Sequence, residues 1–213
     1  MARYGAACTG IVVCVLLCVR LLRAPDAVGS AFYISTPNTS RHRATVAWLK
    51  AENVAGGNTH HVPSTFVSEE HASMTRGAAG CRLSHIDALT RVVTSGSAWN
   101  LVVEDDVAGS YGHALRWIWR IQTVAPNVGA INLYSPKGML RPWMSFRTTA
   151  YFVTPSGAAR LLAVIRANPR VPVDQSWIPG RCTWLTWATT VLFHTWTVPH
   201  GLGVTGAQST IDI

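Results

Sequence analysis

The segment Ala98-Trp99-Asn100-Leu101-Val102-Val103-Glu104-Asp105-Asp106-Val107 decides the fold that we expect for this chain. Its apolar, β-branched run up to Val103 predicts a buried strand, and three carboxylates follow it directly. In an open α/β sheet, ligands bind beyond the carboxyl ends of the strands, so these carboxylates lie where a site would be built. Because neighbouring like charges repel, the cluster favours a bound cation.

Alternation along an extended chain suggests how the carboxylates divide their work. Side chains two residues apart share a face, so Glu104 and Asp106 can point toward one divalent metal ion while Asp105 faces elsewhere. Such an ion would hold a diphosphate. The alternative is an acidic turn that caps the next helix, because an Asp near a helix N-terminus satisfies free N–H groups. The three residues alone do not separate the two interpretations.

Composition limits the partners. The chain has 213 residues, of which 48% are hydrophobic, and this is enough for one domain with a proper core. Its formal net charge is +8, and arginine supplies most of it, since the lysines are Lys50 and Lys137. Arginine suits bidentate phosphate binding. No Lys/Arg run has the density of a nucleic-acid-binding segment, so we expect a compact phosphate ligand and no nucleic acid.

The N-terminus carries a membrane-directed segment. Residues 5–22 hold one charge, that of Arg20. We favour an uncleaved signal-anchor in residues 1–23 over a cleaved signal peptide, because no convincing small-x-small cleavage pattern follows. Residues 24–30 would be a short tether and residues 31–213 the folded domain. The prediction is a single-pass, membrane-anchored protein, lumenal in the endoplasmic reticulum or Golgi if the host is eukaryotic or viral, and membrane-associated if it is bacterial.

Cysteine usage beyond the N-terminal segment is sparse. Cys81 and Cys182 are an even pair, so a lumenal domain could form one disulfide, although their separation in sequence gives no evidence of proximity. No Cys-x-x-Cys or Cys/His spacing suggests a zinc site.

Strand and helix patterns alternate outward from the carboxylates. Strands are predicted at 31–35, 62–67, 99–103, 128–134, 148–153 and 191–198, and helices at 40–52, 77–94, 111–124 and 155–167. Pro63 suggests that the second strand lies at an edge. In the third helix, the side formed by Leu115, Ile118, Trp119 and Gln122 is mostly apolar. This alternation predicts an α/β fold with a doubly wound, mainly parallel sheet.

Basic and small residues open two of these helices. Arg41 and Arg43 lie in the first turn of the 40–52 helix, where they could reach an anion, although a solvated helix face explains them equally well. Small residues at 77–81 permit close approach of the backbone to a ligand or to the sheet. His85, in the same helix, is by spacing alone more often a packed side chain than a catalytic one.

Four separated stretches resemble glycosyltransferase family 25, the lipopolysaccharide and collagen-type galactosyl- or glucosyltransferases. Gly77-Ala78-Ala79-Gly80-Cys81-Arg82-Leu83-Ser84-His85 is similar to the family's Gly-Glu-Ile-Gly-Cys-x-Leu-Ser-His. Leu101 to Val107 looks like its Leu-Glu-Asp-Asp segment, and Thr149 to Leu162 looks like its Ala-Tyr-x-Ile-Ser-x-x-Gly-Ala-x-x-Leu-Leu segment. Pro172-Val173-Asp174 matches a following Pro-Val-Asp. Together they cover residues 31 to about 177.

The resemblance implies a GT-A type fold and the inverting transfer of a hexose from a nucleotide-sugar donor, such as a UDP-hexose. The acceptor would be a hydroxyl on a glycan, lipopolysaccharide or protein, and the cofactor a manganese or magnesium ion. By the same resemblance, Glu104 and Asp106 bind the metal and Asp174 is the acceptor-side carboxylate and candidate base. Donor binding falls to Arg41, Arg43, Ser84, His85 and Asp105.

Departures from the family pattern keep two alternatives open. Ala78 stands where the family usually has Glu, Ser35 where its first strand ends in Asn, and His42 where an Arg is expected. One alternative is therefore a catalytically inactive, glycosyltransferase-like binding protein. The other is a metal-dependent phosphoryl-transfer or phosphatase-type enzyme, which would be expected to carry a phosphate loop that this sequence lacks.

Overall fold

The computed structural model describes residues 28–68, 74–124, 127–133, 148–175, 195–197 and 203–204. The predicted membrane segment at 1–23 and Cys182 lie outside the described residues, so the membrane anchor and the possible disulfide stay predictions. Among the described residues, no helix has both the length and the apolar character that a membrane crossing needs.

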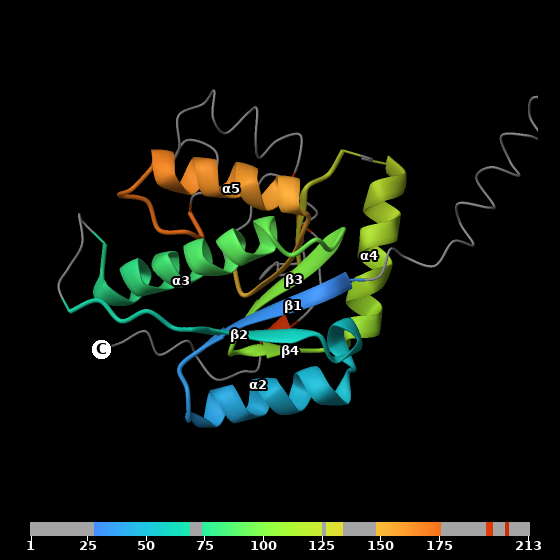
Figure 1. The fold of residues 1–213 in the computed structure, drawn as a ribbon, viewed down its shortest axis with the longest axis horizontal. Helices are drawn as coiled ribbons and strands as arrows, with labels where there is room; N and C mark the ends of the chain where they lie inside the picture. Colours follow the sequence, from blue (N-terminus) through green and yellow to red (C-terminus); the bar gives the residue numbers. More distant parts are fainter. Residues whose placement is uncertain are drawn as a thin grey trace, which may run out of the picture.

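A six-stranded sheet with the order β2-β1-β3-β6-β5-β7 forms the middle of the molecule (Figure 1). Its strands are β1 Val28–Ser35, β2 Thr59–Pro63, β3 Trp99–Glu104, β5 Ala130–Asn132, β6 Ala150–Val153 and β7 Thr195–Thr197. Strand β6 is antiparallel to both of its neighbours, whereas the other pairs are parallel. The prediction of a mainly parallel sheet is therefore confirmed, with one reversed strand. A separate antiparallel pair joins β4 Val107–Ala108 to β8 Gly203–Val204.

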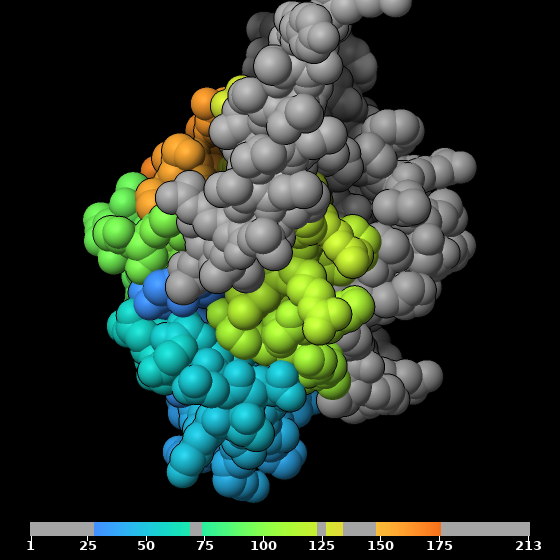
Figure 2. All heavy atoms as spheres, turned by 90° about the vertical axis from the view of Figure 1, so that its right-hand side faces the viewer, coloured from blue at the N-terminus to red at the C-terminus, as the bar shows by residue number. Residues whose placement is uncertain are grey.

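Helices cover both faces of the sheet, as the doubly wound prediction requires. They are α2 Ser40–Ala51, α3 Arg76–Val93, α4 Tyr111–Val124 and α5 Pro155–Ala167, with a short 3-10 turn at Val54–Gly57. Helices α3 and α5 lie together on one face, and α2 and α4 lie on the other (Figure 1). Figure 2 shows the α4 side, where its atoms lie between those of the α2–β2 connection and those of α5.

Side-chain alternation in β3 builds a hydrophobic core on each face. Leu101 and Val103 belong to the core beneath α2 and α4, whereas Val102 belongs to the core beneath α3 and α5. All three are fully buried. The continuous apolar run that predicted a buried strand is thus explained by cover on both sides.

Threonine side chains start three of the helices. Thr39, Thr75 and Thr154 each accept a hydrogen bond from the backbone N–H three residues on. Pro155 follows Thr154 at the first helical position, where a missing N–H costs nothing. The N-cap of α2 is therefore Thr39, directly before the predicted start of this helix at residue 40.

Three predicted boundaries or faces need correction. Strand β1 begins at Val28, which pairs with Trp99, so residues 28–30 belong to the sheet and not to a tether. Strand β2 ends at Pro63 and does not begin near it, although it does lie at the sheet edge as predicted. Among the α4 side chains that the structure describes, Tyr111, Ala114, Ile118 and Ile121 are buried and Leu115 is partly buried against the same core, so the buried face is rotated from the predicted apolar side and shares Ile118 and Leu115 with it.

Candidate functional site

Two adjoining cavities lie beyond the carboxyl ends of β1 and β3. The first, of about 440 Å³, is lined by Ile34, Thr36, Arg41, Ser64, Thr65, Phe66, Val67, Arg76, Gly77, Gly80, Cys81, Ser84, Glu104 and Asp105. The second, of about 380 Å³, is lined by Thr75, Ala78, Cys81, Glu104, Asp106, Thr148, Thr149, Pro172, Val173 and Asp174. Cys81 and Glu104 belong to both walls. The strand that the sequence singled out therefore ends where the two cavities meet.

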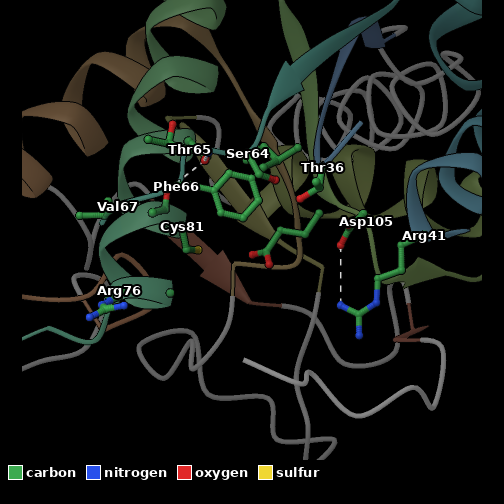
Figure 3. A pocket seen from close by; sticks show the side chains of 14 residues that line it. Thr36, Arg41, Ser64, Thr65, Phe66, Val67, Arg76, Cys81 and Asp105 are labelled. Carbon is green, nitrogen blue, oxygen red and sulfur yellow. Dashed lines mark hydrogen bonds and ion pairs between the residues drawn. The ribbon is translucent and has the colours of Figure 1, made fainter. Parts of the chain in front are cut away.

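In the first cavity, an arginine side chain lies near Asp105, one of the three carboxylates that follow β3. Arg41 Nη1 lies 3.9 Å from Asp105 Oδ1, and both side chains line the cavity (Figure 3). Burial raises the pKa of Asp105, and the nearby Arg41 charge partly offsets this. Arg43 points elsewhere, because its guanidinium donates to the Asn38 carbonyl and it lines neither cavity. Arg41 is therefore the donor-binding candidate of the two.

An aromatic ring lies on the wall of the first cavity. Phe66 is 79% exposed, and Figure 3 shows its ring, in this view, between Cys81 and Asp105. The loop that carries it is fixed, since the Thr65 N–H donates to Ser84 Oγ over 2.9 Å. Gly80 permits this contact, because a Cβ at that position would collide with the Thr65 carbonyl oxygen. The small residues of α3 thus allow close approach of a loop, and Ser84 lines the cavity while holding that loop.

The second cavity gathers the remaining carboxylates. Glu104, Asp106 and Asp174 line it together, although Asp174 is far from the others in sequence. Burial, and then the charges of Glu104 and Asp105, raise the pKa of Asp106 to about 6. Burial also raises the pKa of Asp174, with Glu104 adding to the effect. Carboxylates that disfavour each other's ionisation make a site where a cation is stabilised.

Glu104 is held in place by two side chains from other elements. Thr148 Oγ1 donates to Glu104 Oε1 over 3.0 Å, and His85 Nε2 lies 3.2 Å from the same oxygen. His85 Nδ1 lies 2.9 Å from the Tyr151 hydroxyl. His85 is fully buried and lines neither cavity, so any effect on a donor would pass through Glu104. His85 is therefore a packed side chain that contacts a candidate site residue, Glu104.

The segment that carries Asp174 is fixed by a buried arginine. Arg82, on α3, donates from Nη2 to the Ile165 carbonyl over 2.6 Å and from Nη1 to the Val171 carbonyl over 3.3 Å. The turn beyond it is closed by the Gln175 N–H, which donates to the Pro172 carbonyl. Asp174 is thus placed at the second cavity by contacts that the sequence does not reveal.

Sequence reasoning missed a mixed set of atoms whose geometry could hold a metal ion. The Cys81 Sγ, a His85 ring nitrogen and a Glu104 oxygen all lie within 4.8 Å of one another. Cys81 and His85 are four residues apart on α3, a spacing that would have indicated a shared helix face. Burial raises the pKa of the Cys81 thiol well above its ordinary value, with Glu104 and Asp174 adding to the effect, so this thiol is a poor nucleophile without a metal.

The predicted metal pair suits manganese or magnesium. Glu104 and Asp106 offer hard oxygen donors at the same cavity, while Asp105 faces the other one. The raised pKa of Asp106 points the same way, because a divalent ion would oppose both the burial and the neighbouring carboxylate charges that raise it. Glu104 and Asp106 therefore fit the manganese or magnesium ion that the family resemblance implies.

Comparison with known proteins adds a fold likeness. No protein-family model matches the chain, and no curated protein gives a significant match. The fold is similar to the crystal structure of a glycosyltransferase involved in the glycosylation of the major capsid of PBCV-1, with a TM-score of 0.43 and 15% sequence identity. The alignment covers 79% of this chain and 92% of that chain. The resemblance to family 25 rests on the sequence motifs alone.

Proposed function

We propose that this chain transfers a hexose from a nucleotide-sugar donor, of the UDP-hexose kind, to a hydroxyl on a glycan, lipopolysaccharide or protein, in the manner of family 25. The observation that carries the proposal is the pair of cavities that share Glu104 as a wall. Transfer between two substrates needs two sites that meet at the reacting centre. The Arg41 guanidinium and the Phe66 ring line the first cavity, and the Asp174 carboxylate lines the second.

The first cavity is the proposed donor site. Arg41 offers a guanidinium to a diphosphate, and Asp105 offers a carboxylate to the nucleoside hydroxyls. The exposed Phe66 ring is available to stack on the base. Glu104 and Asp106 would hold the manganese or magnesium ion of a GT-A fold, which supplies Lewis-acid stabilisation of the departing diphosphate. These roles use each lining group for chemistry that its type performs well.

The second cavity is the proposed acceptor site. Asp174 lines it and faces the same space as Glu104. Its raised pKa makes it a stronger base than an exposed Asp, which suits removal of the acceptor hydroxyl proton. An inverting displacement requires this base on the side opposite the leaving group. Placing donor and acceptor in separate cavities across Glu104 provides that separation.

A second candidate function has one observation in its favour. Ala78, which replaces the usual family Glu, lines the second cavity. Loss of a carboxylate from the acceptor side would fit a glycosyltransferase-like protein that binds sugars without transferring them.

We further propose that residues 1–23 anchor either version to a membrane, and carbonate extraction of the expressed protein tests this. Recovery of a soluble chain beginning beyond Ala24 would instead support a cleaved signal peptide.

Calorimetry of the full chain in mild detergent tests the donor site. UDP should bind in the presence of Mn²⁺ and bind at least about tenfold more weakly without it, because the diphosphate then meets the Glu104 and Asp106 carboxylates with no metal ion to screen their charge. Asp106→Ala should remove the Mn²⁺ dependence. Arg41→Ala should weaken UDP binding and the matched Arg43→Ala should not, since only Arg41 lines the cavity. Equal affinity with and without Mn²⁺ would contradict the proposal.

Turnover separates the two candidate functions. With UDP bound as expected, release of UDP from a panel of UDP-hexoses and acceptors would identify a transferase. Donor binding without turnover on any acceptor would favour the inactive alternative.

A further inference from the structure

A second set of side chains, which shares Glu104 with the Glu104–Asp106 pair, lies at the wall between the two cavities. It consists of Cys81, His85 and Glu104, whose ligand atoms all lie within 4.8 Å of one another. Cys81 and His85 are one helical turn apart on α3, and Glu104 is the last residue of β3. One rigid helix and one central strand therefore fix all three donors, so a bound ion would require small side-chain adjustments only.

The set is reachable from solvent on two sides. Cys81 and Glu104 line both cavities, and the Glu104 side chain is 26% exposed. His85 lies behind them and is fully buried. An ion held by these three ligands would therefore be closed on the protein side and open toward the cavities. Three protein ligands with an open fourth position is the pattern of accessible zinc sites.

Tyr151 prepares His85 to act as a ligand. In metal sites, the histidine nitrogen away from the ion is usually fixed by a hydrogen-bonding partner, which sets the tautomer. Here Nε2 faces Glu104 and Nδ1 lies 2.9 Å from the Tyr151 hydroxyl. A hydroxyl can donate or accept. It therefore supports His85 both with the proton on Nε2, donating to Glu104, and with the proton on Nδ1, which leaves the Nε2 lone pair for a metal.

We propose that Cys81, His85 and Glu104 form a binding site for a thiophilic divalent ion, Zn²⁺. Thiolate and imidazole ligands select zinc over manganese and magnesium, which prefer oxygen. On binding, the sulfur–hydrogen bond is replaced by a sulfur–zinc bond and the proton passes to solvent. Because Glu104 is shared with Asp106, zinc at this site competes with manganese or magnesium at the other. The chain would then bind either kind of ion, according to its supply.

Cobalt spectroscopy tests the site without assuming any enzymatic activity. Co²⁺ added to the metal-free, reduced full chain should produce a near-ultraviolet thiolate-to-cobalt absorption and the visible bands of a four-coordinate ion. Zn²⁺ should abolish both signals at one equivalent. Cys81→Ser should lose the thiolate band, and the matched control Cys182→Ser should keep it. Absence of the band from the wild-type protein, or its survival in Cys81→Ser, would overturn the proposal.

Two further variants address folding and the overlap of sites. Tyr151→Phe preserves the buried ring and should weaken Zn²⁺ binding roughly 10- to 100-fold, the usual effect of removing a partner of a metal-bound histidine. Unchanged zinc affinity would remove His85 from the ligand set. Asp106→Ala should lose Mn²⁺-dependent UDP binding and keep the cobalt band. Loss of both signals in Asp106→Ala, with an unfolding temperature that is not lowered, would show a single site and refute the separate zinc set.

Discussion

Replacing Asp106 by Asn should stabilise the metal-free protein at neutral pH and leave it nearly unchanged in acid. Asp106 is only 8% exposed, and its pKa is raised from 3.8 to about 6. The difference between the two values is about 2.2, which corresponds to about 3 kcal/mol at about 1.4 kcal/mol per pKa unit. That is the free energy by which the folded state resists ionisation of this carboxyl.

The sign of the pH dependence follows from proton binding. Between pH 4 and pH 6 the folded state keeps the Asp106 proton and the unfolded state has lost it, so wild-type stability falls as pH rises. Asn has no proton to lose, and its variant should not share this decline. Its advantage should reach up to about 3 kcal/mol at pH 7.5, or about 6–12 °C in unfolding temperature for a chain of this size.

Thermal unfolding in EDTA at pH 4 and pH 7.5 measures this difference. Asp87→Asn is the matched control, because Asp87 is exposed and paired with Arg91 on the helix surface, where such pairs contribute about 0–1 kcal/mol. Added Mn²⁺ should then stabilise the wild type more than Asp106→Asn. Parallel pH curves for wild type and Asp106→Asn would refute the raised pKa of Asp106.

Three other predictions follow from the described contacts. Phe66→Ala should weaken UDP binding by about 1–3 kcal/mol and leave inorganic diphosphate binding unchanged, because the ring would stack only on the base; calorimetry showing equal losses for both ligands would argue against stacking. Asp174→Asn should lower turnover roughly a hundredfold or more without lowering the unfolding temperature, whereas unaltered turnover would remove Asp174 from the mechanism. Gly157→Ala should cost about 1–3 kcal/mol in urea unfolding, because the added Cβ would collide with the Gly129 carbonyl; the control Gly112→Ala, on an open helix surface, should cost nothing, and equal behaviour of the two variants would contradict the close packing.

Local signals in the sequence were enough to predict several elements of the fold. Helix α5 begins at Pro155 and ends at Ala167 as predicted, because a proline start and an Asn-Pro end limit it on both sides. Strand β3 was predicted from its apolar run, which the two hydrophobic cores explain. Strand β2 was misplaced because His60 and His61 are not typical strand residues. Its pairing with β1, a tertiary contact, decides its position.

The candidate site was predictable only as far as its residues follow each other in sequence. Glu104 and Asp106 share a cavity, as alternation along the chain implied. The contacts of Glu104 with His85 and Thr148 join residues that are 19 and 44 positions away, which no local pattern indicates. Phe66 gave no signal at all, because its exposure depends on a loop held against α3 by Ser84.

The reversed direction of strand β6 explains why the second cavity lies beyond the carboxyl end of β3. Because β6 is antiparallel to β3, its beginning lies beside the end of β3, with Ala150 opposite Val103. Thr148 and Thr149 are thereby brought to Glu104, where one donates to the carboxylate and the other accepts from the backbone N–H. If β6 ran parallel to β3, its C-terminal end would lie beside the end of β3. Thr148 and Thr149 would then lie beside the start of β3, away from Glu104.

The same reversal places the candidate base. A helix that follows a strand runs back along the sheet, so α5 returns toward the edge where β6 began, and its C-terminal end lies beside the start of α3 (Figure 1). Arg82 binds carbonyls at the end of α5 and just beyond it, which fixes the turn that carries Asp174. In a β-α-β unit with parallel strands, the residues after the helix would lie beside the N-terminal ends of the strands, away from Glu104. One strand direction therefore brings together Thr148, Tyr151 and Asp174, and it accounts for a carboxylate so distant in sequence facing the end of β3.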